Sequence, residues 1–147
     1  MRVKQYQRGK IRTFKREDID KILEIEAQAF PKTAYSKETL LAYAERLPET
    51  FFVLETSQDI AGYIIFDWGG HVHSMAVKPI HRRRGFGSML FRHALKRIYK
   101  GLWLEVRSKN LPAIGFYKKL GMRIVGKTPN YYGDDDALIM LSDPVER

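Results

Sequence analysis

The sequence predicts a mixed α/β fold, with a partly parallel central sheet and helices on both of its faces. Short apolar segments typical of strands alternate with segments whose apolar residues recur at helical spacing. The inferred order is β-α-α-β-β-β-α-β-α-β-β, and helices between the later strands favour parallel pairing. The 147 residues show no linker and no internal repeat, so we expect a single domain over residues 1–147.

The first half of the chain is expected to contain four strands and two helices. The first helix should end at Phe30, because Pro31 disfavours helical geometry at the residue before it. Ser36 can cap the second helix, which should stop before Pro48. The expected strands are 11–14, 50–56, 60–68 and 71–77, and the expected helices are 16–30 and 37–47.

The second half is expected to alternate helices with strands and to end on a strand pair. Asn110 can cap a short helix with Pro112 in its first turn, and Gly121 can close that helix at its C-terminal end. The expected helices are 87–99 and 111–120, and the expected strands are 102–107, 122–128 and 137–141.

Composition narrows the class of protein. The net charge of +9 indicates an anionic partner, which is a phosphorylated cofactor, RNA or both. The sequence contains no cysteine, which excludes disulfides and a thiol nucleophile and suits a reducing, cytoplasmic location. No apolar run approaches the roughly 20 residues of a membrane span. These short apolar runs lead us to expect no membrane anchor. The four histidines lack a recognisable metal-ligand grouping, so we also expect no metal.

The stretch "HRRRGFGSML" (81–90) joins an expected strand to an expected helix. Gly85 and Gly87 allow the backbone to approach a ligand closely, and the first amides of a helix favour an anion. In physical terms this is a pyrophosphate site. A Gly-x-Gly pattern alone is weak evidence, however, and a tight turn with solvated arginines explains the stretch equally well.

The pattern Arg-x-x-Gly-x-Gly (82–87), after "MAVKP" and before an amphipathic helix, resembles the acetyl-CoA loop of the GCN5-related N-acetyltransferase (GNAT) family. The segments "LEVRSKNLPAIGFYKKLGM" (104–122), "NYYGDDDALIM" (130–140) and "FPKTAYS" (30–36) are similar to RimI-type and Ard-type N-terminal acetyltransferases. The resemblance covers about residues 10 to 141. It implies a GNAT-like fold and direct transfer of acetyl from acetyl-CoA, through a ternary complex, to the N-terminal α-amine of a protein. A ribosomal protein is one candidate acceptor, and CoA is the released product.

The resemblance also implies which residues hold acetyl-CoA. The residues around the pyrophosphate would be Arg82, Arg83, Arg84, Gly85, Phe86, Gly87 and Ser88. The strand residues Met75, Ala76 and Val77 would hold the pantetheine arm and the thioester oxygen, and Asn110 and Tyr117 would also contact the cofactor. An amide donor at the thioester oxygen stabilises the charge that develops there during transfer.

Two residues are implied as catalytic. Glu105 of "LEVR" would act as the base, through a water, and Tyr117 of "GFY" would donate to the CoA sulfur. The alternatives are a strand-edge carboxylate paired with Arg107 or a lysine, and a packed aromatic on the short helix. His71 is a second candidate for the base, because polar groups near this position serve in several relatives. Its alternative is an ordinary polar strand position.

The resemblance places the acceptor peptide between two groups of residues. These are Phe30, Pro31 and Tyr35 on one wall, and the pair Tyr131 and Tyr132 on the other. RimI-like proteins often carry Trp where Tyr35 stands and Arg where Pro129 stands, which leaves the acceptor side less defined than the cofactor side. The acidic run 134–136 is either a solvated turn or an attractor for a cationic N-terminus.

Two other functions remain open from the sequence. Within enzymes, the acceptor could be a lysine side chain or a small amine. In another class, the chain could be a non-catalytic RNA- or ribosome-binding module that uses its basic residues and has lost turnover. The retention of both Glu105 and Tyr117 favours the enzyme. The acceptor protein, the oligomeric state and any association with the ribosome are not determined by the sequence.

Overall fold

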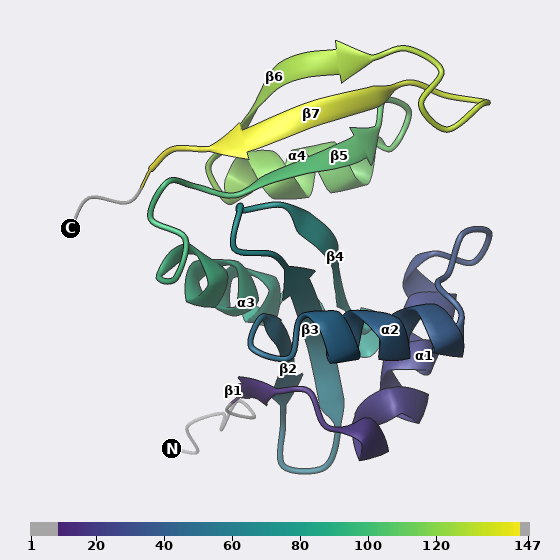
Figure 1. Cartoon of the computed structure of the whole chain (residues 1–147), viewed down its shortest axis with the longest axis vertical. Helices are drawn as coiled ribbons and strands as arrows, with labels where there is room; N and C mark the ends of the chain where they lie inside the picture. Colours follow the sequence, from purple (N-terminus) through teal and green to yellow (C-terminus); the bar gives the residue numbers. More distant parts are fainter. Residues whose placement is uncertain (1–8, 145–147) are drawn as a thin grey trace, which may run out of the picture. The chain divides into compact units, whose positions relative to one another are not determined.

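The computed structural model describes residues 9–144 (Figure 1). The strands are β1 (Lys10–Thr13), β2 (Phe51–Glu55), β3 (Ile60–Phe66), β4 (Val72–Val77), β5 (Trp103–Arg107), β6 (Met122–Thr128) and β7 (Ala137–Ser142). The helices are α1 (Ile19–Ala29), α2 (Lys37–Arg46), α3 (Phe86–Leu95) and α4 (Leu111–Lys119), with 3₁₀ turns η1 (Arg16–Asp18) and η2 (Pro79–His81). Strands and α-helices follow the order expected from the sequence.

The described chain forms two compact units. Unit 1 comprises residues 9–66 and 73–92, and unit 2 comprises residues 67–72 and 93–144. The polypeptide therefore passes between the units three times, directly after β3, inside β4 and inside α3. Whether residues 1–147 act as one domain, as the sequence suggests, remains a prediction.

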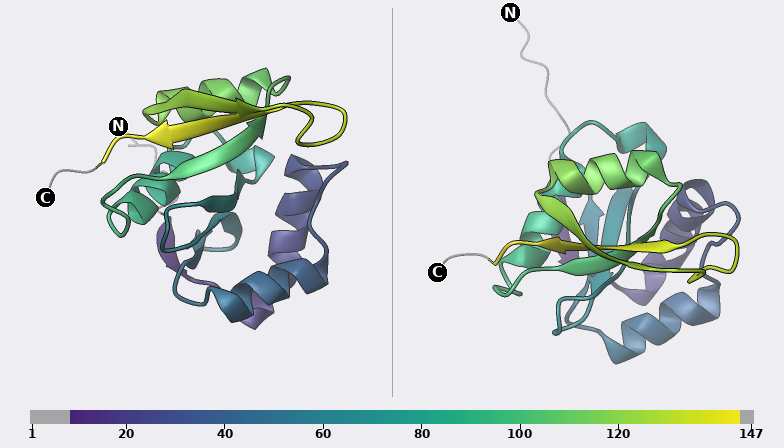
Figure 2. Two further views of the ribbon diagram at one scale, coloured as in Figure 1. Left: turned by 45° about the horizontal axis from the view of Figure 1, so that its top comes forward. Right: turned by 90° about the horizontal axis from the view of Figure 1, so that it is seen from above.

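Unit 1 is built on a sheet with strand order β1-β2-β3-β4, in which β2 pairs antiparallel with β1 and β3. Alternate residues of β2 and β3 point to opposite faces. Phe51 and Tyr63 pack with the buried isoleucines of α1 and with Leu40 of α2. On the other face, Gly62 lies against Leu90 of α3. Helices on both faces of this sheet are thus confirmed, and Figure 2 shows α1 and α2 together on one side of it.

Local signals set the helix ends in unit 1. The hydroxyl of Ser36 accepts a hydrogen bond from the Thr39 amide, which caps α2 as expected. Helix α1 ends at Ala29, just before the Phe30-Pro31 step. Ile22 and Ile25 on its inner face are fully buried, and each such side chain contributes about 1.5–3 kcal/mol relative to an exposed one.

Unit 2 carries an antiparallel sheet of order β5-β7-β6, against which α4 packs through β6. Asn110 caps α4 through the Ala113 amide, and Gly121 ends it with a φ of +95°. A parallel bridge joins His71 to Trp103. The expected parallel pairing is therefore present only as this isolated bridge among the described residues. The described strand pairs of both sheets are antiparallel.

Helix α3 is shorter than predicted. The sequence pattern extends it to residue 99, whereas the helix ends at Leu95. The amides of Arg97 and Ile98 both donate to the carbonyl of Ala94, which tightens the last turn before Gly101 reverses the chain at a φ of +103°.

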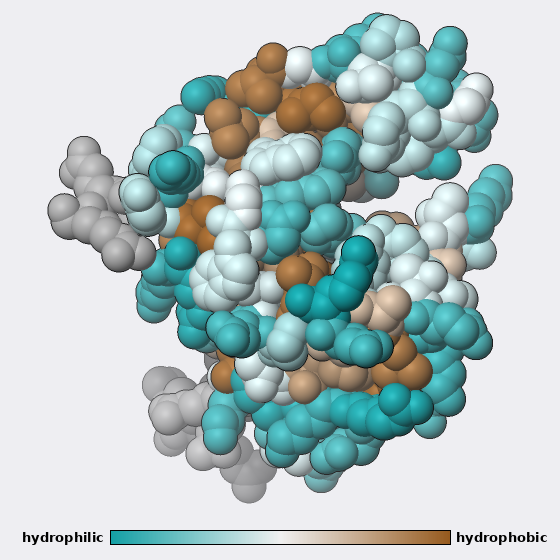
Figure 3. Space-filling model, viewed as in Figure 1, coloured by the Kyte–Doolittle hydropathy of each residue, from teal (hydrophilic) through white to brown (hydrophobic). Residues whose placement is uncertain are grey.

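The surface of unit 2 includes an apolar area over β6 and β7, drawn in brown in Figure 3. Ile124 and Val125 of β6 are exposed apolar side chains of this unit. Within residues 9–144, no helix combines the length and the apolar character that a membrane crossing needs.

Candidate active site

The arginine- and glycine-rich stretch forms the turn between η2 and α3 in unit 1. Arg83 has a φ of +65° and Gly85 a φ of +78°, both in the left-handed region. Turns with such residues direct successive backbone N–H groups toward one point and form anion-binding concavities. The side chains of Arg82, Arg83 and Arg84 are exposed around this turn.

This turn fits a CoA pyrophosphate. The first amides of α3, those of Phe86, Gly87 and Ser88, have no acceptor within the helix, and the helix dipole adds positive potential at the same end. A Cβ placed on Gly85 would meet no atom within 4 Å, so the space beside the turn is open to a ligand. The guanidinium of Arg82 is held by a hydrogen bond from its Nε to the Val77 carbonyl (3.1 Å).

Buried side chains fix both ends of the turn. Phe86 is buried at the start of α3, and its ring centre lies 6.2 Å from that of His81, with the two rings tilted by 56°. Nε2 of His81 donates to Oδ2 of Asp59 (3.0 Å), and Nζ of Lys78 donates to the same oxygen (3.2 Å). Burial alone would raise the pKa of Asp59, but the hydrogen bonds from His81 and Lys78 outweigh it and hold that pKa at about 2. The sequence had assigned no role to His81.

The strand that leads into the turn offers backbone groups to a ligand. The Lys78 amide donates to the Ala61 carbonyl of β3, so the peptide groups of Val77, one residue earlier, point away from β3. Strand β4 is the last strand of its sheet. Met75 and Ala76 are buried within unit 1. The role expected for Met75, Ala76 and Val77 stays a prediction.

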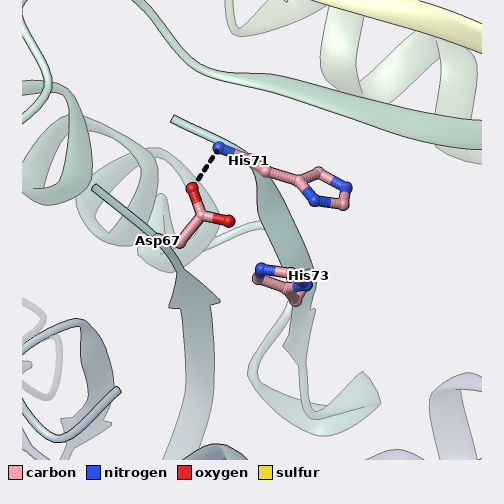
Figure 4. Close-up of side chains that lie close together, drawn as sticks. All are labelled: Asp67, His71 and His73. Atoms are coloured by element: carbon pink, nitrogen blue, oxygen red, sulfur yellow. Dashed lines mark hydrogen bonds between the residues drawn. The ribbon is translucent and has the colours of Figure 1, made fainter. Parts of the chain in front are cut away.

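Unit 2 brings Glu105 of β5 against His71. Nε2 of His71 donates to Oε2 of Glu105 at 2.7 Å, and both side chains are about one-fifth exposed. The His71 ring stacks on Trp103, with centroids 4.0 Å apart and an interplanar angle of 9°. The backbone of His71 is fixed by a turn in which its amide donates to Oδ1 of Asp67 (3.2 Å), as Figure 4 shows. Glu105 thus has a histidine partner, where the sequence analysis had considered Arg107 or a lysine.

Tyr132 lies in the electrostatic surroundings of Glu105, and Tyr117 lies in those of Tyr132. Burial raises the pKa of Tyr132, and the negative charge of Glu105 raises it further. Burial, followed by the influence of Tyr132, raises the pKa of Tyr117 to about 12. Tyr117 therefore keeps its proton at any physiological pH, which suits a hydrogen-bond donor.

The loop between β6 and β7 is held by its own acidic residues. Asp134 accepts from Arg107 (2.6 Å), and the guanidinium of Arg107 lies 4.2 Å from the centre of the Tyr132 ring. Asp135 accepts from the hydroxyl of Ser108 and the amide of Lys109, and Asp136 accepts from the Asn130 amide. The acidic run is therefore a set of structural acceptors that shapes the loop. The sequence analysis had interpreted this run as a solvated turn or as an attractor for a cationic N-terminus. Neither interpretation included this structural role.

The remaining expected site residues fall in both units. Tyr131 is half-exposed in unit 2 and meets the Tyr132 ring edge-on at 4.9 Å. In unit 1, Phe30 and Tyr35 border the α1/α2 core, and Pro31 is exposed in the turn after α1. Asn110 acts as the cap of α4, and its contact with a cofactor stays a prediction.

Trp103 and Asp67 were missed by the sequence analysis. Trp103, Glu105 and Arg107 alternate with the buried Leu104 and Val106 along β5, a period of two that is visible in "LWLEVR". That period could have placed Trp103 beside Glu105. Nothing local to the sequence could have placed His71 against a residue 34 positions away.

Comparison with known proteins agrees with this geometry. The sequence pattern of the Acetyltransferase (GNAT) family matches residues 19–122. The chain belongs to this family. An N-alpha-acetyltransferase from Sulfurisphaera tokodaii is 32% identical, with 92% of this chain and 93% of that protein covered. The protein is therefore an acyltransferase, and acetyl-CoA is its cosubstrate.

Two solved structures of similar proteins extend the comparison to the fold. Ard1 from Thermoplasma volcanium has a TM-score of 0.80 at 31% identity, covering 94% of this chain and 99% of that chain. The ribosomal-protein-S18-alanine N-acetyltransferase from Escherichia coli has a TM-score of 0.76 at 26% identity, covering 95% and 96%. The GNAT-like fold implied by the sequence motifs is thereby confirmed.

Proposed function

We propose that the protein transfers an acetyl group from acetyl-CoA to the N-terminal α-amine of a protein. The observation that carries this proposal is the arrangement around Glu105 in unit 2, where a carboxylate is hydrogen-bonded to His71 and electrostatically coupled to the protonated Tyr132. A partly exposed carboxylate that a histidine holds in place can act as a general base toward an amine. The names of the relatives reported above support a protein N-terminus as the acceptor.

In this proposal, each group in unit 2 has a separate task. An α-amine has a pKa near 7.7–8.0, so a modest base suffices to deprotonate it. Glu105 takes the proton that the amine loses as the new C–N bond forms, through a water, and His71 orients the carboxylate through the hydrogen bond from its Nε2. Tyr117, which is protonated because its pKa is about 12, gives a hydrogen bond and then a proton to the sulfur as the C–S bond breaks.

Unit 1 contributes the binding of the thioester in this proposal. The turn 82–88 holds the pyrophosphate through its backbone amides and arginines, and the outward amide of Val77 holds the pantetheine arm. An amide donor near the thioester oxygen stabilises the charge that develops on it. The residues proposed to contact the acceptor peptide are Phe30 and Tyr35 in this unit, and Tyr131 and Tyr132 in unit 2.

The cellular setting follows from the proposed acceptor. A ribosomal protein is the candidate acceptor that we favour, because one structural relative carries that substrate in its name. The enzyme would then act in the cytoplasm, where ribosomal proteins are made, and its net charge of +9 would favour contact with ribosomal RNA.

The decisive experiment measures CoA release from acetyl-CoA with paired peptides that differ only in a free or a blocked N-terminus, some with an internal lysine. We expect release with free N-termini only. Release with blocked peptides that contain lysine would move the acceptor to the lysine side chain. Failure to bind acetyl-CoA, combined with salt-sensitive RNA binding, would replace the enzyme with a nucleic-acid-binding module.

A further inference from the structure

Unit 1 contains a buried carboxylate that the proposed chemistry does not use. Glu26, on the inner face of α1, is 1% exposed. Its Oε1 accepts from the hydroxyl of Tyr63 on β3 and from Oγ of Ser74 on β4 (3.1 Å). Its Oε2 accepts from the backbone amide of Tyr35 (3.0 Å). One side chain therefore connects a helix, two strands and the loop that follows the helix.

These donors are two hydroxyls and a backbone amide, all neutral. Burying a carboxylate in this way is costly, since its charge is compensated by hydrogen bonds in place of water or a counter-ion. The network also extends beyond Glu26, because the hydroxyls of Tyr63 and Ser74 are 2.8 Å apart. Burial raises the pKa of Tyr63 well above its ordinary value, and the charge of Glu26 raises it further, so the Tyr63 hydroxyl stays a donor.

The two ends of this network lie at proposed binding elements. Tyr35 belongs to the proposed wall for the acceptor peptide, and its own hydroxyl donates to the carbonyl of His73 on β4 (3.2 Å). Its ring packs against Tyr43, which in turn packs against His73, with centroids 5.6 and 5.2 Å apart. Ser74 directly precedes Met75 in the strand segment proposed to hold the thioester.

We propose that Glu26 is a positioning residue, whose carboxylate fixes the Tyr35 loop to β4 and so sets the position of Tyr35, which is proposed to contact the first residue of the acceptor. A purely apolar core would hold α1 against the sheet without specifying this loop. The loop 30–36 has a short turn over residues 31–33, and the Glu26 bond fixes the Tyr35 backbone beyond it. This inference rests on the proposed function, since it concerns a residue proposed to contact the acceptor.

The test compares three variants of the full chain. Glu26→Ala removes all three acceptor contacts. Glu26→Gln keeps an oxygen for the Tyr35 amide and puts an NH₂ opposite two hydroxyls, which can turn to accept from it. Asp18→Ala is the matched control, because Asp18 is also a buried carboxylate of unit 1, at the start of α1, but its partners are Arg12 and the Lys15 amide. Both alanine variants should lower Tm.

We expect Glu26→Ala alone to raise KM for the peptide about tenfold, with kcat changed by less than about threefold. In the same variant, kcat/KM should differ less between peptides that have different first residues. Glu26→Gln should restore both values to within about threefold of the wild type. If Asp18→Ala shows the same KM and selectivity changes, or if Glu26→Gln behaves like Glu26→Ala, the positioning role is wrong.

A readout independent of activity separates this inference from the proposed function. Amide hydrogen exchange over residues 31–36 should accelerate in Glu26→Ala and stay unchanged in Asp18→Ala, because the Tyr35 amide loses its acceptor only in the former. Unchanged exchange in Glu26→Ala overturns the positioning role, whatever the activity. A wild-type protein that acetylates no peptide overturns the proposed function instead, and leaves the exchange result to decide whether Glu26 holds the loop.

Discussion

Glu26 in unit 1 and Glu105 in unit 2 are carboxylates of the same type in opposite situations. Glu26 is completely enclosed, and its two oxygens accept from three neutral donors. Glu105 lies on a strand, is about one-fifth exposed, and accepts from a histidine that can itself carry a proton. A fully satisfied, buried carboxylate can only hold its neighbours in place, whereas a partly open one beside a titratable partner can exchange protons with a substrate.

The strongest test of this difference is Glu105→Gln. The substitution keeps the shape of the side chain and removes its ability to accept a proton, so we expect kcat to fall about 10²- to 10³-fold. Acetyl-CoA binding and Tm should change little. The matched control is Glu55→Gln, since Glu55 is also borne by a strand but pairs with Arg12. Comparable losses in both variants would contradict a specific role for Glu105.

The next largest effect is expected from Tyr117→Phe, which removes the proposed donor to the sulfur. We expect kcat to fall about 10- to 100-fold, with peptide KM little changed. Because the pKa of Tyr117 is about 12, its phenol stays protonated between pH 8 and 10. Ionisation of Tyr117 should therefore not lower the wild-type rate in this range. Tyr99→Phe, at an exposed tyrosine, serves as the control. A wild-type rate that falls near pH 9, with a flat profile in Tyr117→Phe, would show that the phenol ionises earlier.

The two glutamates also differ in how far the sequence predicted them. The helix caps at Ser36 and Asn110, and the reversal at Gly121, were predictable because each depends on residues within a few positions. Glu105 was found through its motif. Its contact with His71 depends on the turn at Asp67 and on a bridge between distant strands, and these arise only from tertiary pairing.

The partners of Glu26 could not be predicted from the sequence either. In the sequence it reads as one more position on the buried face of a helix, since its spacing matches that of Ile22 and Ile25. A carboxylate on that face indicates buried polar partners, but the partners come from the loop at Tyr35, from β3 and from β4. Helical periodicity locates such a residue and cannot identify what it holds.

Asp59 extends the comparison to a carboxylate that has the ammonium group of Lys78 among its partners. Its pKa of about 2 lies below that of an unfolded aspartate, near 3.9, so it contributes stability that is present above pH 4 and lost as the pH falls toward 2. Asp59→Asn should therefore lower the free energy of unfolding by roughly 2 kcal/mol at pH 5–7, and the deficit should shrink toward pH 2. Urea denaturation at several pH values measures this. Asp143→Asn, at an exposed ion pair, should change little at any pH.

The smallest expected effect concerns the turn at the start of α3 in unit 1, and a glycine of unit 2 provides its control. A Cβ on Gly85 or on Gly115 of α4 would meet nothing within 4 Å. An alanine at either position would therefore clash with no neighbouring atom. The two positions differ in backbone conformation, because Gly85 has a φ of +78° and Gly115 lies inside a helix. An L-residue in the left-handed region costs roughly 1–2 kcal/mol, whereas alanine is favoured over glycine inside a helix by about 1 kcal/mol.

Gly85→Ala should therefore strain the turn and raise the Kd of acetyl-CoA about tenfold, as measured by isothermal titration calorimetry. Gly115→Ala should leave that Kd unchanged and raise Tm slightly. If Gly85→Ala binds acetyl-CoA as tightly as the wild type, the left-handed turn is not what holds the pyrophosphate, and the arginines around it become the principal binding groups. A triple change of Arg82, Arg83 and Arg84 to glutamine would then weaken binding more than Gly85→Ala does, and increasingly so at low salt.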